Sequence, residues 1–77
     1  CNISVKVKDK LRVINSEKLS IETENQEKTL QGKGRIMIHV SGTEPCIRVM
    51  VESEDDEVSK AVAGSLCETI KAIDKEL

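Results

Sequence analysis

The complete absence of aromatic side chains is the feature that most limits how this chain can fold. The 77 residues include no Phe, Tyr or Trp, so the core has to be built from Ile, Val, Leu, Met and Ala. Each fully buried aliphatic side chain contributes only about 1.5–3 kcal/mol, and a chain of this size buries roughly 60% of its unfolded surface. We therefore expect a single small domain over residues 1–77, of modest stability, that is part of a larger protein.

Charge and composition narrow the possible partners. The net charge is −2, from 12 Lys and Arg against 14 Asp and Glu, which gives no general field that attracts nucleic acid or an anionic membrane. The missing aromatics also remove the stacking platforms that single-strand binders use. No apolar run is long enough to span a bilayer. We expect no nucleic-acid partner and no membrane partner.

The cysteine pattern argues against a metal or redox site. Cys1, Cys46 and Cys67 are odd in number and far apart, and His39 is the single histidine. None of them shows the paired spacing of zinc ligands or of a redox motif. We expect reduced thiols, a cytoplasmic location and no metal ion bound by this chain.

Alternating apolar residues predict strands in three places. Ile3, Val5 and Val7 alternate with polar residues, and we expect Leu11 and Val13 to extend that strand past a kink. Residues 35–40 and 46–52 alternate in the same way. The short turn between them has Gly42 free to adopt a positive φ and a proline at its exit, so this pair predicts a β-hairpin.

Two segments have helical character. Residues 17–30 are mostly helix formers with a thin apolar face, preceded by possible caps at Asn15 and Ser16 and followed by Gln31-Gly32, which suits a left-handed helix end. The second segment, residues 58–77, has an apolar stripe at three- and four-residue spacing, with Ser53 as the expected cap. We expect Gly64 to allow this helix close to the sheet. The predicted fold is α+β: an antiparallel sheet with two helices on one face, in the order β-α-β-β-α.

The hairpin turn holds the residues best suited to chemistry. Ser41 and Thr43 offer hydroxyl donors, Gly42 lets backbone N–H groups approach an anion, and Arg48 on the returning strand can grip a phosphate through two donors. Such a convergence is what recognition of a tetrahedral dianion requires. On residue types alone, an ordinary hairpin with a solvated arginine is the favoured interpretation.

A family resemblance bears on that choice. Ser41-Gly42-Thr43-Glu44-Pro45 followed by Arg48-Val49-Met50-Val51-Glu52 resembles the signature of the last domain of the α-D-phosphohexomutase superfamily. The Arg-Val-Met-Val-Glu segment is most similar to the phosphoglucosamine mutase family. The resemblance implies a TATA-binding-protein-like fold and a C-terminal domain of a larger enzyme.

The resemblance also implies roles for individual residues. In such enzymes the loop matching Ser41, Gly42, Thr43 and Glu44, with the arginine matching Arg48, binds the substrate phosphate that is not being transferred. A phosphoserine in another domain exchanges its phosphoryl group with the sugar, which interconverts glucosamine 6-phosphate and glucosamine 1-phosphate for amino-sugar and peptidoglycan precursors. The implied partners are a phosphosugar and the other domains of the parent enzyme.

This chain departs from the family at one candidate residue. His39 stands where the family usually has an arginine, two residues before the serine. A neutral histidine can still donate one hydrogen bond, and below about pH 6.5 a histidine is cationic. A strand residue without a role is an equally open interpretation of His39.

Other family features are missing altogether. The serine nucleophile loop and the Asp-x-Asp-x-Asp magnesium cluster are both absent, so we expect no catalytic residue here, Mg²⁺ bound outside this chain, and no activity from the isolated domain. Two alternatives stay open: the same domain of a phosphomannomutase or phosphoglucomutase, and a non-catalytic anion-binding module.

Overall fold

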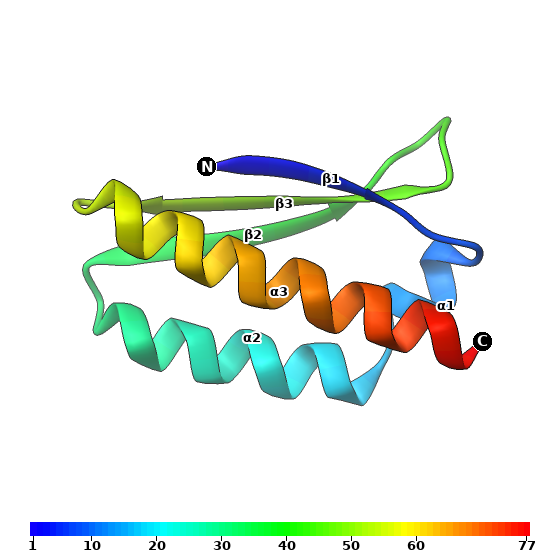
Figure 1. Cartoon of the computed structure of the whole chain (residues 1–77), viewed down its shortest axis with the longest axis horizontal. Helices are drawn as coiled ribbons and strands as arrows, with labels where there is room; N and C mark the ends of the chain where they lie inside the picture. Colours follow the sequence, from blue (N-terminus) through cyan, green and yellow to red (C-terminus); the bar gives the residue numbers. More distant parts are fainter.

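The computed structural model describes all 77 residues as one sheet covered on one face by helices (Figure 1). The elements in chain order are β1 (Asn2–Lys6), α1 (Lys10–Ile14), α2 (Glu17–Leu30), β2 (Gly34–Val40), β3 (Cys46–Ser53) and α3 (Asp56–Glu76). The predicted α+β class, the antiparallel sheet and the order β-α-β-β-α are confirmed, with the five-residue α1 added between the first strand and the first long helix.

The sheet has β3 at its centre, paired antiparallel with β1 and with β2. Val49 of β3 lies opposite Ile3 of β1 and Ile38 of β2. The preceding residue, Arg48, lies opposite Ser4 and His39. Because successive strand side chains point to opposite faces, the aliphatic row faces the helices and the polar row lies on the open face of the sheet.

The core lies between the sheet and the two long helices, which run side by side beneath it (Figure 1). The predicted stripe of α3 is confirmed, since Val62, Leu66, Ile70 and Ile73 are all buried; Leu77 at its end is exposed. The largest fully buried side chains are Ile47, Leu66, Ile70, Val13, Val49, Val51 and Val62. Although α3 has 21 residues, neither it nor the other helices carry an apolar stretch able to cross a membrane.

The predicted extension of the first strand through Leu11 and Val13 is wrong. Both residues lie in α1, where Val13 is fully buried and Leu11 is 61% exposed. Asp9 causes the change, because its carboxylate accepts a hydrogen bond from the Arg12 N–H at 3.1 Å and so caps the new helix.

The predicted caps of the long helices also need correction. Ser16 occupies the N-cap position of α2 without a side-chain bond, and the Asn15 amide instead donates to the Leu11 carbonyl at 2.9 Å. At α3 the cap is Asp55, whose carboxylate accepts from two backbone N–H groups, and not Ser53. The Ser53 hydroxyl donates to the Asp55 carbonyl oxygen at 2.7 Å. A carboxylate at this position also favours the positive end of the helix dipole.

The glycines have different roles from those expected. The left-handed end of α2 is confirmed at Gln31 (φ 52°) and Gly32 (φ 77°). Gly64, however, does not bring α3 close to the sheet, because a Cβ there would meet nothing within 4 Å. Gly34 is the glycine that permits a close approach: a Cβ there would collide with the Glu52 carbonyl oxygen.

These glycines make a matched pair for a stability test. We predict that Gly34→Ala lowers the free energy of unfolding by about 1–3 kcal/mol, because the methyl group overpacks the start of β2. Gly64→Ala should raise it by about 1 kcal/mol, because alanine favours a helix interior and the site has room. Urea unfolding of both variants checks the prediction, and a Gly34→Ala variant as stable as the parent would contradict the close approach.

Candidate anion-binding site

Residues predicted for the site converge at the hairpin between β2 and β3. A hollow of about 380 Å³ lies there, lined by His39, Val40, Ser41, Gly42, Thr43 and Arg48. Five of the six predicted site residues line this hollow, and the exception is Glu44. The convergence follows from the antiparallel register, which sets His39 directly opposite Arg48 next to the turn.

The turn of the hairpin, which we call the anion loop (residues 41–45), is closed by its own hydrogen bonds. The Ser41 N–H donates to the Cys46 carbonyl oxygen at 3.0 Å, and the Cys46 N–H donates to the Glu44 carbonyl oxygen at 2.8 Å. The Ser41 hydroxyl oxygen accepts from the Glu44 N–H at 3.2 Å. The Glu44 amide is therefore engaged within the loop, which explains why this residue contributes to the shape of the loop and not to the lining of the hollow.

Several donors of the hollow remain free. The N–H groups of Gly42 and Thr43 have no hydrogen-bond partner, and the Thr43 hydroxyl has none either. The Ser41 hydroxyl accepts one bond and still has its own hydrogen to donate. Arg48 makes no ion pair, unlike Arg35 at the far end of the same sheet face, which pairs with Glu52 at 2.9 Å. The hollow therefore presents unpaired donors of the kinds that bind a tetrahedral anion.

Gly42 contributes to the hollow through the space beside it and not through the positive φ that its sequence context suggested. The expected positive φ is wrong, since Gly32 is the glycine with that conformation. A Cβ on Gly42 would meet nothing within 4 Å, so the residue leaves open space beside its own N–H group. That space is what a ligand needs to approach the backbone closely.

His39 is exposed on the open face of β2, directly across from Arg48. Its ring makes no hydrogen bond or ion pair within the chain. Both side chains line the same hollow, so an imidazolium at His39 would add a second positive charge beside Arg48.

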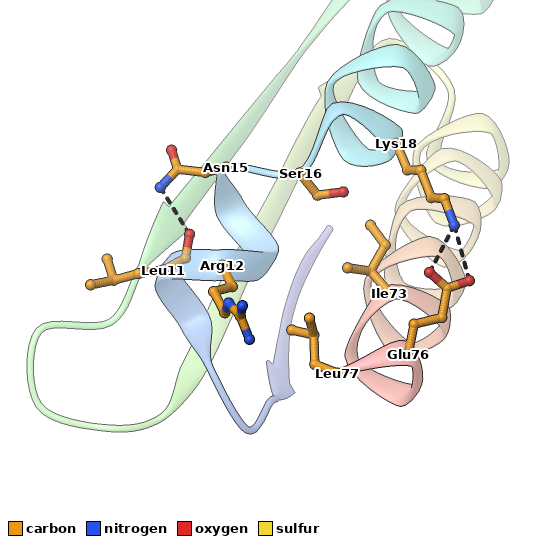
Figure 2. A pocket seen from close by; sticks show the side chains of 8 residues that line it. All are labelled: Leu11, Arg12, Asn15, Ser16, Lys18, Ile73, Glu76 and Leu77. Atoms are coloured by element: carbon orange, nitrogen blue, oxygen red, sulfur yellow. Dashed lines mark hydrogen bonds and ion pairs between the residues drawn. The ribbon is translucent and has the colours of Figure 1, made fainter.

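A larger hollow lies between α1 and the adjoining ends of α2 and α3 (Figure 2). Its volume is about 490 Å³, and its lining includes the apolar side chains Leu11, Ile73 and Leu77. The Lys18 ammonium there donates to both carboxylate oxygens of Glu76, at 2.9 and 2.7 Å. The unpaired guanidinium of Arg12 and the Ser16 hydroxyl also line this hollow, but the Glu76 carboxylate lies there too and would repel an anion, whereas no carboxylate lines the hollow at the anion loop.

Metal-binding and nucleophilic groups are not assembled in the structure. No group of three or more His, Cys, Asp or Glu side chains is placed to hold a metal ion. The acidic residues Glu54, Asp55, Asp56 and Glu57 follow β3, and among them Asp55 caps α3. Cys46 and Cys67 are buried and Cys1 is exposed, all unpaired. Burial raises the pKa of the Cys67 thiol, while the positive charge of Lys71 opposes the rise, so Cys67 favours the protonated form.

Sequence reasoning missed one residue of the site. The Lys10 ammonium, at the start of α1, donates to the carbonyl oxygens of Ser41 at 2.5 Å and Glu44 at 3.3 Å. Lys10 lies 31 residues before Ser41, and no local pattern in the sequence connects the two.

The chain is similar to known proteins over most of its length. The sequence model of the family described as phosphoglucomutase/phosphomannomutase, C-terminal domain, matches residues 2–69. The chain is 49% identical over 69 residues to a phosphoglucosamine mutase of Natranaerobius thermophilus, which covers 90% of this chain and 16% of that protein.

Two further relatives agree with this match. A phosphoglucosamine mutase of Pelotomaculum thermopropionicum is 44% identical over 71 residues, 92% of this chain and 16% of its own length. One of Bacillus licheniformis is 40% identical over 70 residues, 91% of this chain and 16% of its own length. The chain therefore spans about a sixth of the length of the curated relatives it matches.

The position of His39 generates a pH prediction. If His39 contributes to the anion site, sulfate should bind more tightly at pH 6 than at pH 8, because histidine is the type of side chain that changes its charge over this pH range. Sulfate is the suitable probe since its own charge is the same at both values. His39→Arg should tighten binding at pH 8 and bring the affinities at the two pH values together.

Amide shifts measured during sulfate titrations give the affinities. His39→Gln is the matched control, which keeps a hydrogen-bond donor but never charges, and it should lose the pH dependence without tighter binding. An unmodified chain whose sulfate affinity is equal at pH 6 and pH 8 contradicts a role for His39.

Proposed function

The chain belongs to the phosphoglucomutase/phosphomannomutase C-terminal domain family, and on that basis we propose that it is the substrate-phosphate-binding domain of a phosphoglucosamine mutase. Membership makes it a phosphohexomutase domain. The proposed substrates are glucosamine 6-phosphate and glucosamine 1-phosphate, and the names of the most similar relatives support this choice over a mannose or glucose phosphate.

The observation that carries the proposal is the set of free donors in the hollow. Two backbone N–H groups, two hydroxyls and one unpaired guanidinium line a space that is open to solvent. A phosphate dianion needs several donors at once, and it gains most from a planar guanidinium that can donate twice. Binding would therefore centre on the N–H groups of Gly42 and Thr43 and on Arg48.

The proposed role of this site in catalysis is to bind a phosphate and not to transfer one. It can hold the phosphate at one end of the sugar while the other end reacts. Phosphoryl transfer also requires charge positioned around the moving group. We propose that the other domains of the parent enzyme supply the phosphoserine and Mg²⁺, and that the isolated chain has no mutase activity.

A binding site for either end of the sugar has to release its ligand between the two half-reactions. The bisphosphate intermediate reverses its orientation in the site between the two half-reactions, so each of its phosphates occupies the anion loop in turn. Four of the residues that line the hollow, His39, Gly42, Thr43 and Arg48, are exposed to solvent. This exposure is compatible with such exchange, because the ligand can enter and leave without unfolding of the loop.

Arg48 provides the test. A charge-assisted hydrogen bond contributes about 1.5–3 kcal/mol, so Arg48→Ala should weaken the binding of inorganic phosphate roughly 10- to 100-fold. Arg48→Lys should recover only part of the loss, because an ammonium cannot reproduce the two-pronged contact of a guanidinium. Phosphate titrations of the labelled chain, followed by amide shifts, measure both effects.

Arg35→Ala is the matched control. Arg35 lies on the same open face but at the far end of the sheet, where Glu52 already neutralises it. Its removal should leave phosphate affinity unchanged. Equal weakening by Arg35→Ala and Arg48→Ala would mean that the face attracts anions only through its overall charge, and would contradict a site at the anion loop.

A further inference from the structure

The anion loop is held from outside by the segment that joins β1 to α1. The Lys10 ammonium donates to the Ser41 and Glu44 carbonyl oxygens, and the Val7 N–H donates to the Pro45 carbonyl oxygen at 2.9 Å. Three carbonyl groups of the loop are therefore fixed by residues more than 30 positions earlier in the chain. The conformation of the loop therefore depends on contacts with a distant part of the sequence as well as on the hydrogen bonds within the turn.

One of these bonds sets the direction of a free donor. In a trans peptide group the C=O and the following N–H point in opposite directions, and the chain has no cis peptide bond. The Ser41 carbonyl and the Gly42 N–H belong to the same peptide group. Because the carbonyl is directed at Lys10, the Gly42 N–H is directed away from Lys10.

The direction away from Lys10 is the open side of the sheet. α1 lies on the same side of the sheet as α2 and α3, and its Val13 is part of the core beneath the sheet (Figure 1). Lys10 therefore reaches the loop from the helix side. His39 and Arg48 alternate with core residues of β2 and β3, so they lie on the opposite, open face.

The lysine also changes the electrostatics of the loop. A carbonyl oxygen that faced a dianion would repel it, and Lys10 engages two of the loop carbonyls. No carboxylate pairs with the Lys10 ammonium, so its positive charge is not cancelled by an ion pair. Both effects leave a loop that presents donors to a ligand.

We infer that Lys10 is a positioning residue of the phosphate site: it holds the Ser41 and Glu44 carbonyls on the helix side and thereby presents the Gly42 N–H to a phosphate beside Arg48. This inference rests on the proposed function and extends it to a residue outside the hairpin. Lys10 acts through the loop backbone and does not itself contact the ligand.

The test compares three variants of the 77-residue chain. Lys10→Met keeps the length of the side chain and removes the ammonium, and Lys10→Arg restores a positive donor. Lys60→Met removes one exposed positive charge from α3, near the end of that helix farthest from the anion loop (Figure 1). Two quantities are measured: the ¹⁵N order parameter of Gly42 without ligand, and the affinity for inorganic phosphate. Urea unfolding shows that each variant is folded.

In the unmodified chain and in Lys60→Met we expect a Gly42 order parameter near the rigid value of about 0.85, and in Lys10→Met a value below about 0.6. Phosphate should bind about 3- to 10-fold more weakly to Lys10→Met, as the loss of an orienting hydrogen bond implies. Lys10→Arg should remain within about twofold of the unmodified chain.

Other outcomes overturn the inference. A Lys10→Met chain that is less stable, but has an unchanged Gly42 order parameter and phosphate affinity, would make Lys10 a structural residue only. Equal weakening by Lys60→Met would reduce the effect to net charge. If the unmodified chain binds no phosphate, the proposed function fails, and the order parameters measured without ligand still decide whether Lys10 orients Gly42.

Discussion

The antiparallel pairing of β3 with both neighbouring strands determines which side chains enter the core and which reach the candidate site. Ile47, Val49 and Val51 of β3 are buried, and a shift of one residue in either pairing would turn them to solvent. The same register fixes Arg48 on the other face, opposite His39 and beside the turn. The burial that stabilises an all-aliphatic core therefore also assembles the candidate site.

The division between the two faces explains how so small a chain can offer a binding site. The helix side supplies almost all of the buried apolar surface, while the open face needs no packing and can carry free donors. The two sides meet at the hairpin. Lys10 holds the anion loop from the helix side, and the free N–H groups and Arg48 lie on the open face. Burial of apolar side chains does not orient those donors, because the direction of each N–H group is set by the hydrogen bonds of its own peptide group.

The sequence predicted the features that repeat along the chain. Period-two alternation located β2, β3 and most of β1, and the apolar stripe located α3. It failed where a single side chain decides the local conformation: Asp9 starts α1 in place of a longer strand, and Asp55 replaces Ser53 as a cap. Several residues can cap a helix equally well on sequence alone, and tertiary contacts select among them.

The candidate site shows the same limit. The hairpin residues were predicted together because they are close in the sequence, and the register places them around one hollow. Lys10 was missed because its bonds to the loop cross 31 and 34 residues, and such contacts leave no local pattern. Gly64 was predicted to allow α3 close to the sheet, but the close approach in the structure is at Gly34, between β2 and β3. Which glycine faces backbone depends on how the strands pair, and a single sequence does not show that.

Phosphate binding at the anion loop can be checked with a map of backbone amide shifts on addition of inorganic phosphate to the unmodified chain. We expect the largest changes on Gly42 and Thr43, the loop residues whose N–H groups have no partner. The largest changes at the start of α3, or around Leu11 and Leu77 in the hollow between the helices, would contradict binding at the anion loop.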